Sequence, residues 1–69
     1  MTDRELRRAA YWWKVQSCRE QMEAHEAERV LAMDLGDLER AQHCLARWEA
    51  YSNLRTATME KLKKLEARK

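Results

Sequence analysis

The chain has 69 residues, with 14 lysines and arginines against 12 aspartates and glutamates, for a formal net charge of +2. Two domains are excluded at this length, because domains rarely have fewer than ~50 residues. The two cysteines, with no secretory signal before them, argue against a disulfide scaffold. The apolar runs are far shorter than the ~18 residues of a transmembrane helix. We therefore expect a small cytoplasmic protein with reduced thiols and no membrane contact.

The first element predicted along the chain is a helix over residues 3–34. Thr2 and Glu5 have the spacing of a capping box, in which the threonine hydroxyl accepts a hydrogen bond from the first turn. The residues that follow are mostly good helix formers such as alanine, leucine, glutamate and arginine. Gly36 is expected just beyond the end of this helix, because glycine adopts the positive φ of that position at little cost.

A second helix is predicted over residues 38–67, with Asp37 as its N-cap. Each helix would be roughly 45 Å long at ~1.5 Å per residue. Two helices of equal length joined by a tight turn predict an all-α fold, an antiparallel coiled-coil-like hairpin that occupies residues 1–69 as one unit. Residues at the same level would have numbers that sum to about 72, because the turn lies near residue 36.

A heptad pattern predicts which side of each helix faces the other. On the first helix the 4-3 spacing selects Leu6, Ala10, Trp13, Ser17, Glu20, Ala24, Ala27 and Leu31. On the second helix it selects Leu38, Ala41, Leu45, Trp48, Ser52, Arg55, Met59 and Leu62. With these two sets facing each other, small residues on one helix lie opposite large residues on the other at most levels of the hairpin. Near its centre, Glu20 can reach Arg55 and form a polar pair between the helices.

A second stripe with the same spacing would then point outward from the first helix. It comprises Tyr11, Val15, Cys18, Met22 and His25, with Trp12 beside it and Tyr51 on the second helix. Exposed apolar stripes of this kind mark interaction surfaces. They predict a non-enzymatic protein–protein interaction module, such as a small adaptor, inhibitor or assembly factor. Its partner is a second copy, which would complete a four-helix bundle as a homodimer, or another protein.

Charge is segregated along the predicted hairpin. The first 19 and last 15 residues together carry 11 basic and four acidic side chains, whereas residues 20–54 carry three basic and eight acidic ones. This polarity favours an antiparallel dimer. The alternative is a dimeric nucleic-acid-binding regulator that uses its basic end. Its candidate phosphate contacts are Arg4, Arg7, Arg8, Lys61, Lys63, Lys64 and Arg68.

Catalytic, cofactor and metal sites are not expected. The single glycine excludes a glycine-rich phosphate loop, and no serine and histidine have a recognisable nucleophile–base arrangement. Cys18 and His25 would lie ~10 Å apart on one helix, too far to share a zinc ion. A small-molecule substrate is therefore not expected either.

Overall fold

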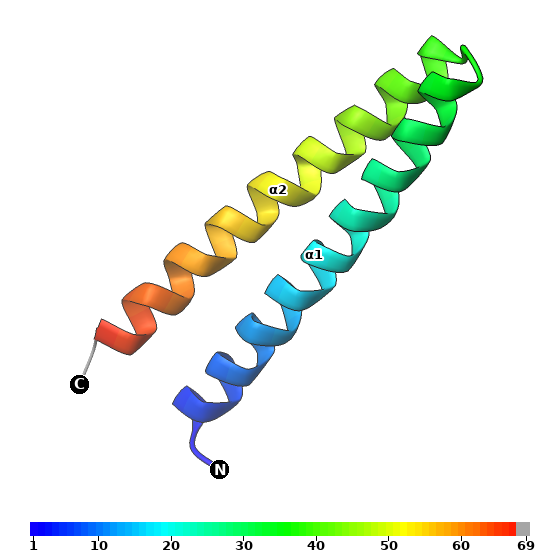
Figure 1. The fold of residues 1–69 in the computed structure, drawn as a ribbon. Coiled ribbons are helices and arrows are strands. Elements are labelled where there is room, and N and C mark those ends of the chain that lie inside the picture. The colour runs from blue at the N-terminus through cyan, green and yellow to red at the C-terminus, as the bar shows by residue number, and fades with distance from the viewer. Residues whose placement is uncertain (68–69) are drawn as a thin grey trace.

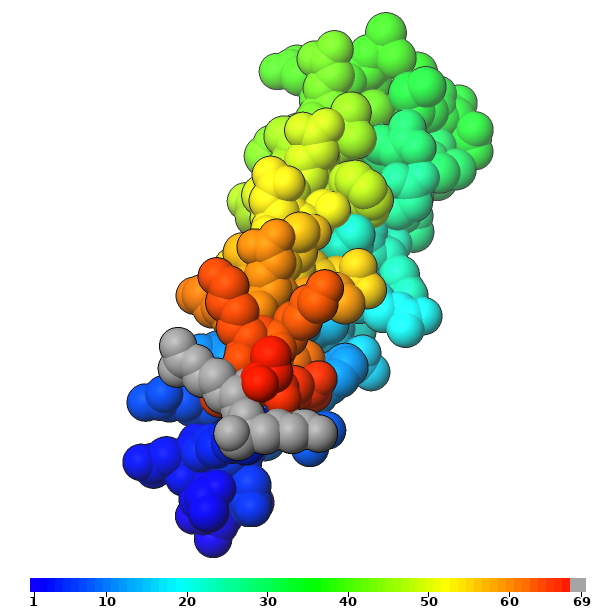
Figure 2. All heavy atoms as spheres, turned by 90° about the vertical axis from the view of Figure 1, so that its left-hand side faces the viewer, coloured from blue at the N-terminus to red at the C-terminus, as the bar shows by residue number. Residues whose placement is uncertain are grey.

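The computed structural model describes residues 1–67 as two antiparallel helices, α1 (Asp3–Asp34) and α2 (Leu38–Ala67). Both ends of the described chain lie at the same end of a long hairpin (Figure 1). The Cα atoms extend over 52 × 17 × 11 Å, and the space-filling view shows the same elongated body (Figure 2). The predicted all-α hairpin is confirmed, with helix bounds that match the expected ranges.

Local hydrogen bonds explain where α1 begins. The Thr2 hydroxyl accepts a bond from the Glu5 backbone N–H at 3.2 Å, and Thr2 itself is extended with φ −78° and ψ 160°. The Leu6 N–H donates to the Thr2 carbonyl at 3.0 Å. These bonds satisfy donors that the first helical turn leaves unpaired. The N-cap role predicted for Thr2 is therefore confirmed.

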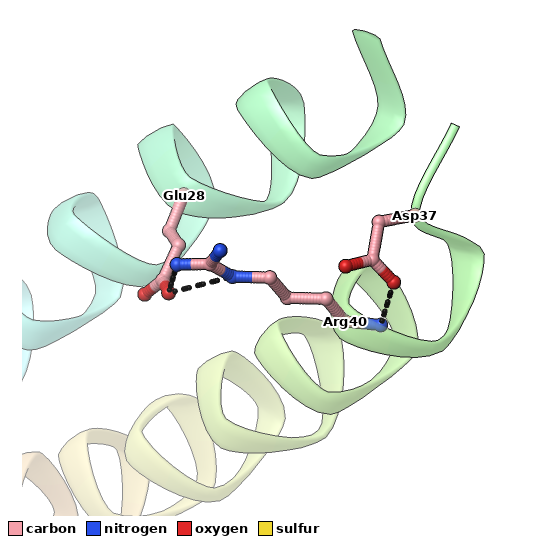
Figure 3. Close-up of polar contacts among 3 residues, drawn as sticks. All are labelled: Glu28, Asp37 and Arg40. Atoms are coloured by element: carbon pink, nitrogen blue, oxygen red, sulfur yellow. Dashed lines mark hydrogen bonds and ion pairs between the residues drawn. The ribbon is translucent and has the colours of Figure 1, made fainter. Parts of the chain in front are cut away.

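The turn between the helices is a Schellman motif closed by Gly36, which has φ +75°. The Asp37 N–H donates to the Ala32 carbonyl at 2.9 Å, and the Gly36 N–H donates to the Met33 carbonyl at 3.1 Å. Asp37 then caps α2, because its Oδ1 accepts the Arg40 N–H at 3.1 Å (Figure 3). One tripeptide thus ends the first helix and starts the second.

The interior of the hairpin is a single seam with heptad spacing. Its α1 positions are Tyr11, Val15, Cys18, Met22, His25, Arg29 and Ala32, all of them buried or half-buried. Its α2 positions are Ala41, Cys44, Trp48, Tyr51, Arg55, Thr58, Leu62 and Leu65, again buried or half-buried. Alternating steps of three and four residues keep such a stripe facing its partner helix. The hairpin is therefore packed as a two-helix coiled coil.

The seam predicted for α1 is wrong in its rotation about the helix axis. Leu6, Trp13 and Leu31 are 53%, 74% and 56% exposed. Half of the α2 prediction, Ala41, Trp48, Arg55 and Leu62, does lie in the seam. Both α1 stripes have 4-3 spacing, but the predicted one contains Glu20, whose carboxylate is costly to bury, whereas the buried one contains no carboxylate.

The predicted alignment of the two helices along their long axes is correct, although their predicted rotation about those axes is not. The rings of His25 and Tyr51 are stacked across the seam, with their centroids 5.7 Å apart. Near the open end, Arg8 Nε lies 3.4 Å from Glu66 Oε1. Both pairs agree with the level imposed by a turn at residue 36.

The predicted polar layer between Glu20 and Arg55 is also wrong. Glu20 is exposed, since its stripe faces away from α2. Arg55 does lie in the seam, and its Nε is buried without a hydrogen-bond partner among residues 1–67. Burying the Glu20 carboxylate would cost far more than leaving it hydrated.

Replacement of Gly36 by alanine is expected to destabilise the hairpin by about 1–2 kcal/mol. A Cβ at this position would meet no atom within 4 Å, so the loss comes from the positive φ and not from a clash. Urea unfolding followed by circular dichroism measures it. Gly36→Asn is the control, because asparagine tolerates this conformation better. Equal stability of the alanine variant and the wild type would contradict the role given to Gly36.

Candidate functional site

The residues predicted to form an outward protein-binding stripe lie mostly inside the hairpin. Val15 and Cys18 are 5% and 2% exposed. The other seam members of that set, Tyr11, Met22, His25 and Tyr51, are half-buried. Trp12 is the one predicted anchor on the open surface, at 48% exposure. The stripe is therefore not a free docking surface, because α2 already covers it.

An exposed apolar surface does exist, on one side of the seam. Most of its residues directly follow a seam residue, and Leu38 lies one heptad before Leu45 on α2. The shared hollow lined by Met33, Leu38 and Leu45 shows that these flanks of α1 and α2 border the same side. We call this surface the apolar side; it comprises Trp12, Val30, Met33, Leu38, Leu45 and Met59, each between 39% and 62% exposed.

An open groove on the apolar side runs over the seam itself. Met22, Ala27, Val30 and Trp48 line it, and Arg55 closes one end. Its charged rim is neutralised within α1, because Arg19 pairs with Glu23 at 3.3 Å. The groove therefore has an apolar lining, and the charges at its rim largely cancel.

A second ion pair on this side joins neighbouring turns of α1. Arg29 Nη2 lies 2.7 Å from Glu26 Oε1. Hydrogen bonds from Arg29 lower the pKa of the Glu26 carboxyl, and its positive charge adds to that effect. Arg29 is a seam residue. Its aliphatic stem lies along the seam, and the pair with Glu26 holds its charged guanidinium at the surface.

The opposite side of the seam is rich in cations. Its flanking positions recur every seven residues along each helix. They are Arg7, Lys14, Gln21 and Glu28 on α1 and Arg40, Arg47, Leu54 and Lys61 on α2. We call this surface the basic side. Contact across it is direct, because Arg40 Nη2 lies 2.8 Å from Glu28 Oε1 (Figure 3). Leu54 is its one large apolar side chain that is more than 36% exposed.

A hollow at the open end of the basic side brings three cations together. Arg7, Lys61 and Lys64 line it, with Tyr11 and Leu65 below them. Over residues 1–67, no carboxylate is among its lining residues. It is the place on the described surface where the predicted phosphate contacts converge.

The structure separates the other predicted phosphate contacts from this hollow. Arg4 donates a hydrogen bond to the Leu65 carbonyl at 3.1 Å, and Arg8 pairs with Glu66 at 3.4 Å. Lys63 directly follows the seam residue Leu62 and does not line the hollow. Arg68 lies outside the described residues.

The described surface offers no arrangement for metal chemistry. Among residues 1–67, no three histidine, cysteine, aspartate or glutamate side chains are grouped as metal ligands. Cys18 and Cys44 are buried free thiols. Neither helix, over its described length, combines the span and apolar content of a membrane-crossing segment.

Leu38, Leu45 and Met59 were not predicted as exposed interaction residues. All three were placed in the predicted seam, so they were expected to be buried. A usable signal was present, because Cys44, Tyr51, Thr58 and Leu65 repeat every seven residues. A seam that includes these four residues predicts the rotation of both helices that the structure shows. Leu45 and Met59 then become flanking positions.

Comparison of the chain with protein-family models, curated proteins and solved structures finds no match.

Replacement of Glu28 by glutamine is expected to lower the melting temperature at pH 7 but not at low pH. Hydrogen bonds and positive charge from Arg40 lower the pKa of the Glu28 carboxyl from its ordinary 4.5. The stability contributed by the pair is fully present above pH 4.5 and is lost as pH falls through the lowered pKa. Thermal unfolding at a series of pH values measures the difference.

Glu20→Gln is the matched control, because Glu20 is an exposed glutamate on the outer face of the same helix. It should leave the pH dependence of the melting temperature close to that of the wild type. A Glu28→Gln effect that persists unchanged at pH 2 would contradict a charge-dependent pair.

Proposed function

We propose that this chain is a non-enzymatic protein-binding module whose apolar side docks a second copy to form a four-helix bundle. The observation that carries the proposal is an excess of accessible surface. The hairpin exposes 5680 Å², whereas a compact monomer of 8.3 kDa exposes about 4,600 Å². Packing of two hairpins against each other would bury most of this excess surface.

The dimensions of the apolar side support a stable interface. The two larger extents of the hairpin, 52 and 17 Å, give a face of roughly 900 Å², and a standard interface hides about 800 Å² on each partner. Over residues 1–67, the buried apolar core comprises Val15, Cys18, Ala32, Ala41, Cys44 and Leu62. Domains of this size with so small an interior usually need a staple, and association supplies one.

Charge polarity supports an antiparallel orientation of the two copies. The open end of the hairpin is basic and the turn end is acidic. A two-fold axis perpendicular to the long axis would place each basic end beside the acidic end of the other copy. Opposite charge at the rim selects orientation and speeds encounter more than it adds affinity.

Leu45→Glu is expected to convert the dimer to a monomer. Leu45 lies on the apolar side at 41% exposure, so a carboxylate there would be buried without a partner in the interface. Leu54→Glu is the matched control, because Leu54 lies on the basic side at 39% exposure. Light scattering over a concentration series should give twice the chain mass for the wild type and for Leu54→Glu.

Circular dichroism on the same samples shows whether each variant keeps its helices. A wild type that stays monomeric at every concentration would overturn self-association. Equal masses for a folded Leu45→Glu variant and the wild type would place the interface on another surface.

A further inference from the structure

We propose that the basic side binds the phosphate backbone of duplex nucleic acid without regard to sequence, through the hollow formed by Arg7, Lys61 and Lys64. This goes beyond the proposed dimer and does not depend on it. All three residues belong to one hairpin, and they lie on the side of the seam opposite to the apolar side.

Among residues 1–67, the cations of this hollow form no ion pair with a carboxylate. Its lining combines one guanidinium and two ammonium groups from both helices, and no carboxylate of the described chain is part of it. Elsewhere on the molecule, Arg8 is paired with Glu66 and Arg29 with Glu26. Like charges held together in this way favour an anionic ligand, and phosphate accepts hydrogen bonds from all three.

The cations continue along the same side away from the hollow. Lys14 lies one heptad beyond Arg7 on α1, a rise of about 10.5 Å, and Arg47 lies two heptads from Lys61 on α2. Glu28 is the one carboxylate at the flanking positions of this side, and it is held by Arg40. A row of uncompensated charges of this length matches a linear polyanion better than a small phosphate compound.

A duplex fits this row better than a single strand or a lipid surface. Single strands are bound by exposed aromatic platforms, and Tyr11, the aromatic residue in the hollow, is half-buried beneath the cations. Surface-bound helices insert apolar side chains beside their basic residues, and Leu54 is the one large candidate here. A duplex carries one phosphate per ~1.7 Å of its axis, so its phosphates can contact this row of cations at any position along the duplex.

The deciding experiment compares two adjacent lysines. Lys64 lines the hollow, whereas Lys63 faces away from it and carries the same charge. Binding of Lys64→Gln, Lys63→Gln and wild type to a fluorescent 20-base-pair DNA duplex, and to an RNA duplex of the same sequence, is measured over a salt series. Lys64→Gln should reduce the slope of log K against log salt by about 1, and Lys63→Gln should leave it unchanged.

Further arms separate this proposal from its alternatives and from dimerisation. The monomeric Leu45→Glu variant should retain the Lys64-dependent slope, because the site lies within one hairpin. Polyglutamate of equal charge should compete poorly with the duplex. Equal loss from the two lysine variants, tighter binding of polyglutamate or of anionic vesicles, or no duplex binding at low salt would each overturn the proposal.

Discussion

The structure depends on the close approach of two helices along one seam of small side chains. Ala32, Ala41, Cys18 and Cys44 are nearly inaccessible, and their small volume lets the backbones pack together. Two helices share only one seam, so every other stripe of each helix remains at the surface. The rotation of the helices about their axes therefore decides which residues are available for binding. In this chain that rotation buries Tyr11, Val15 and Met22 and exposes the residues beside them.

The rotation also sorts the flanking residues by chemistry. The apolar side carries Trp12, Met33, Leu38 and Leu45, whereas the basic side has a cation at five of its eight flanking positions. The seam holds the two helices together, and on the basic side the Glu28–Arg40 pair adds one direct contact between them. The two proposals assign a different partner to each side, a second copy of the chain to the apolar side and a polyanion to the basic side.

The sequence was sufficient for the features set by local interactions. Thr2, Gly36 and Asp37 determine where helices begin and end through bonds within a few residues, so the bounds and the level of the helices were predictable. The helix rotation is a non-local property, because it compares the total burial of two stripes with identical spacing. Matching small with large residues was the wrong criterion. The cost of burying Glu20 was the better criterion. A carboxylate in the seam needs a hydrogen-bonding or charged partner, and its free energy is lower when it stays hydrated at the surface.

The observed rotation leaves an exposed apolar surface, at a different place from the predicted stripe. A heptad helix has room for about two seam positions in seven, and apolar residues beyond that number must lie on a flank. This chain has more than one seam can bury, in either phase. In the observed phase the surplus collects beside a groove that crosses Met22 and Trp48, where both helices contribute. A second layer packed there would leave each basic side on the outside of the bundle. The proposed dimer and the proposed phosphate-binding row are therefore compatible in one assembly, because the seam keeps their surfaces on opposite sides.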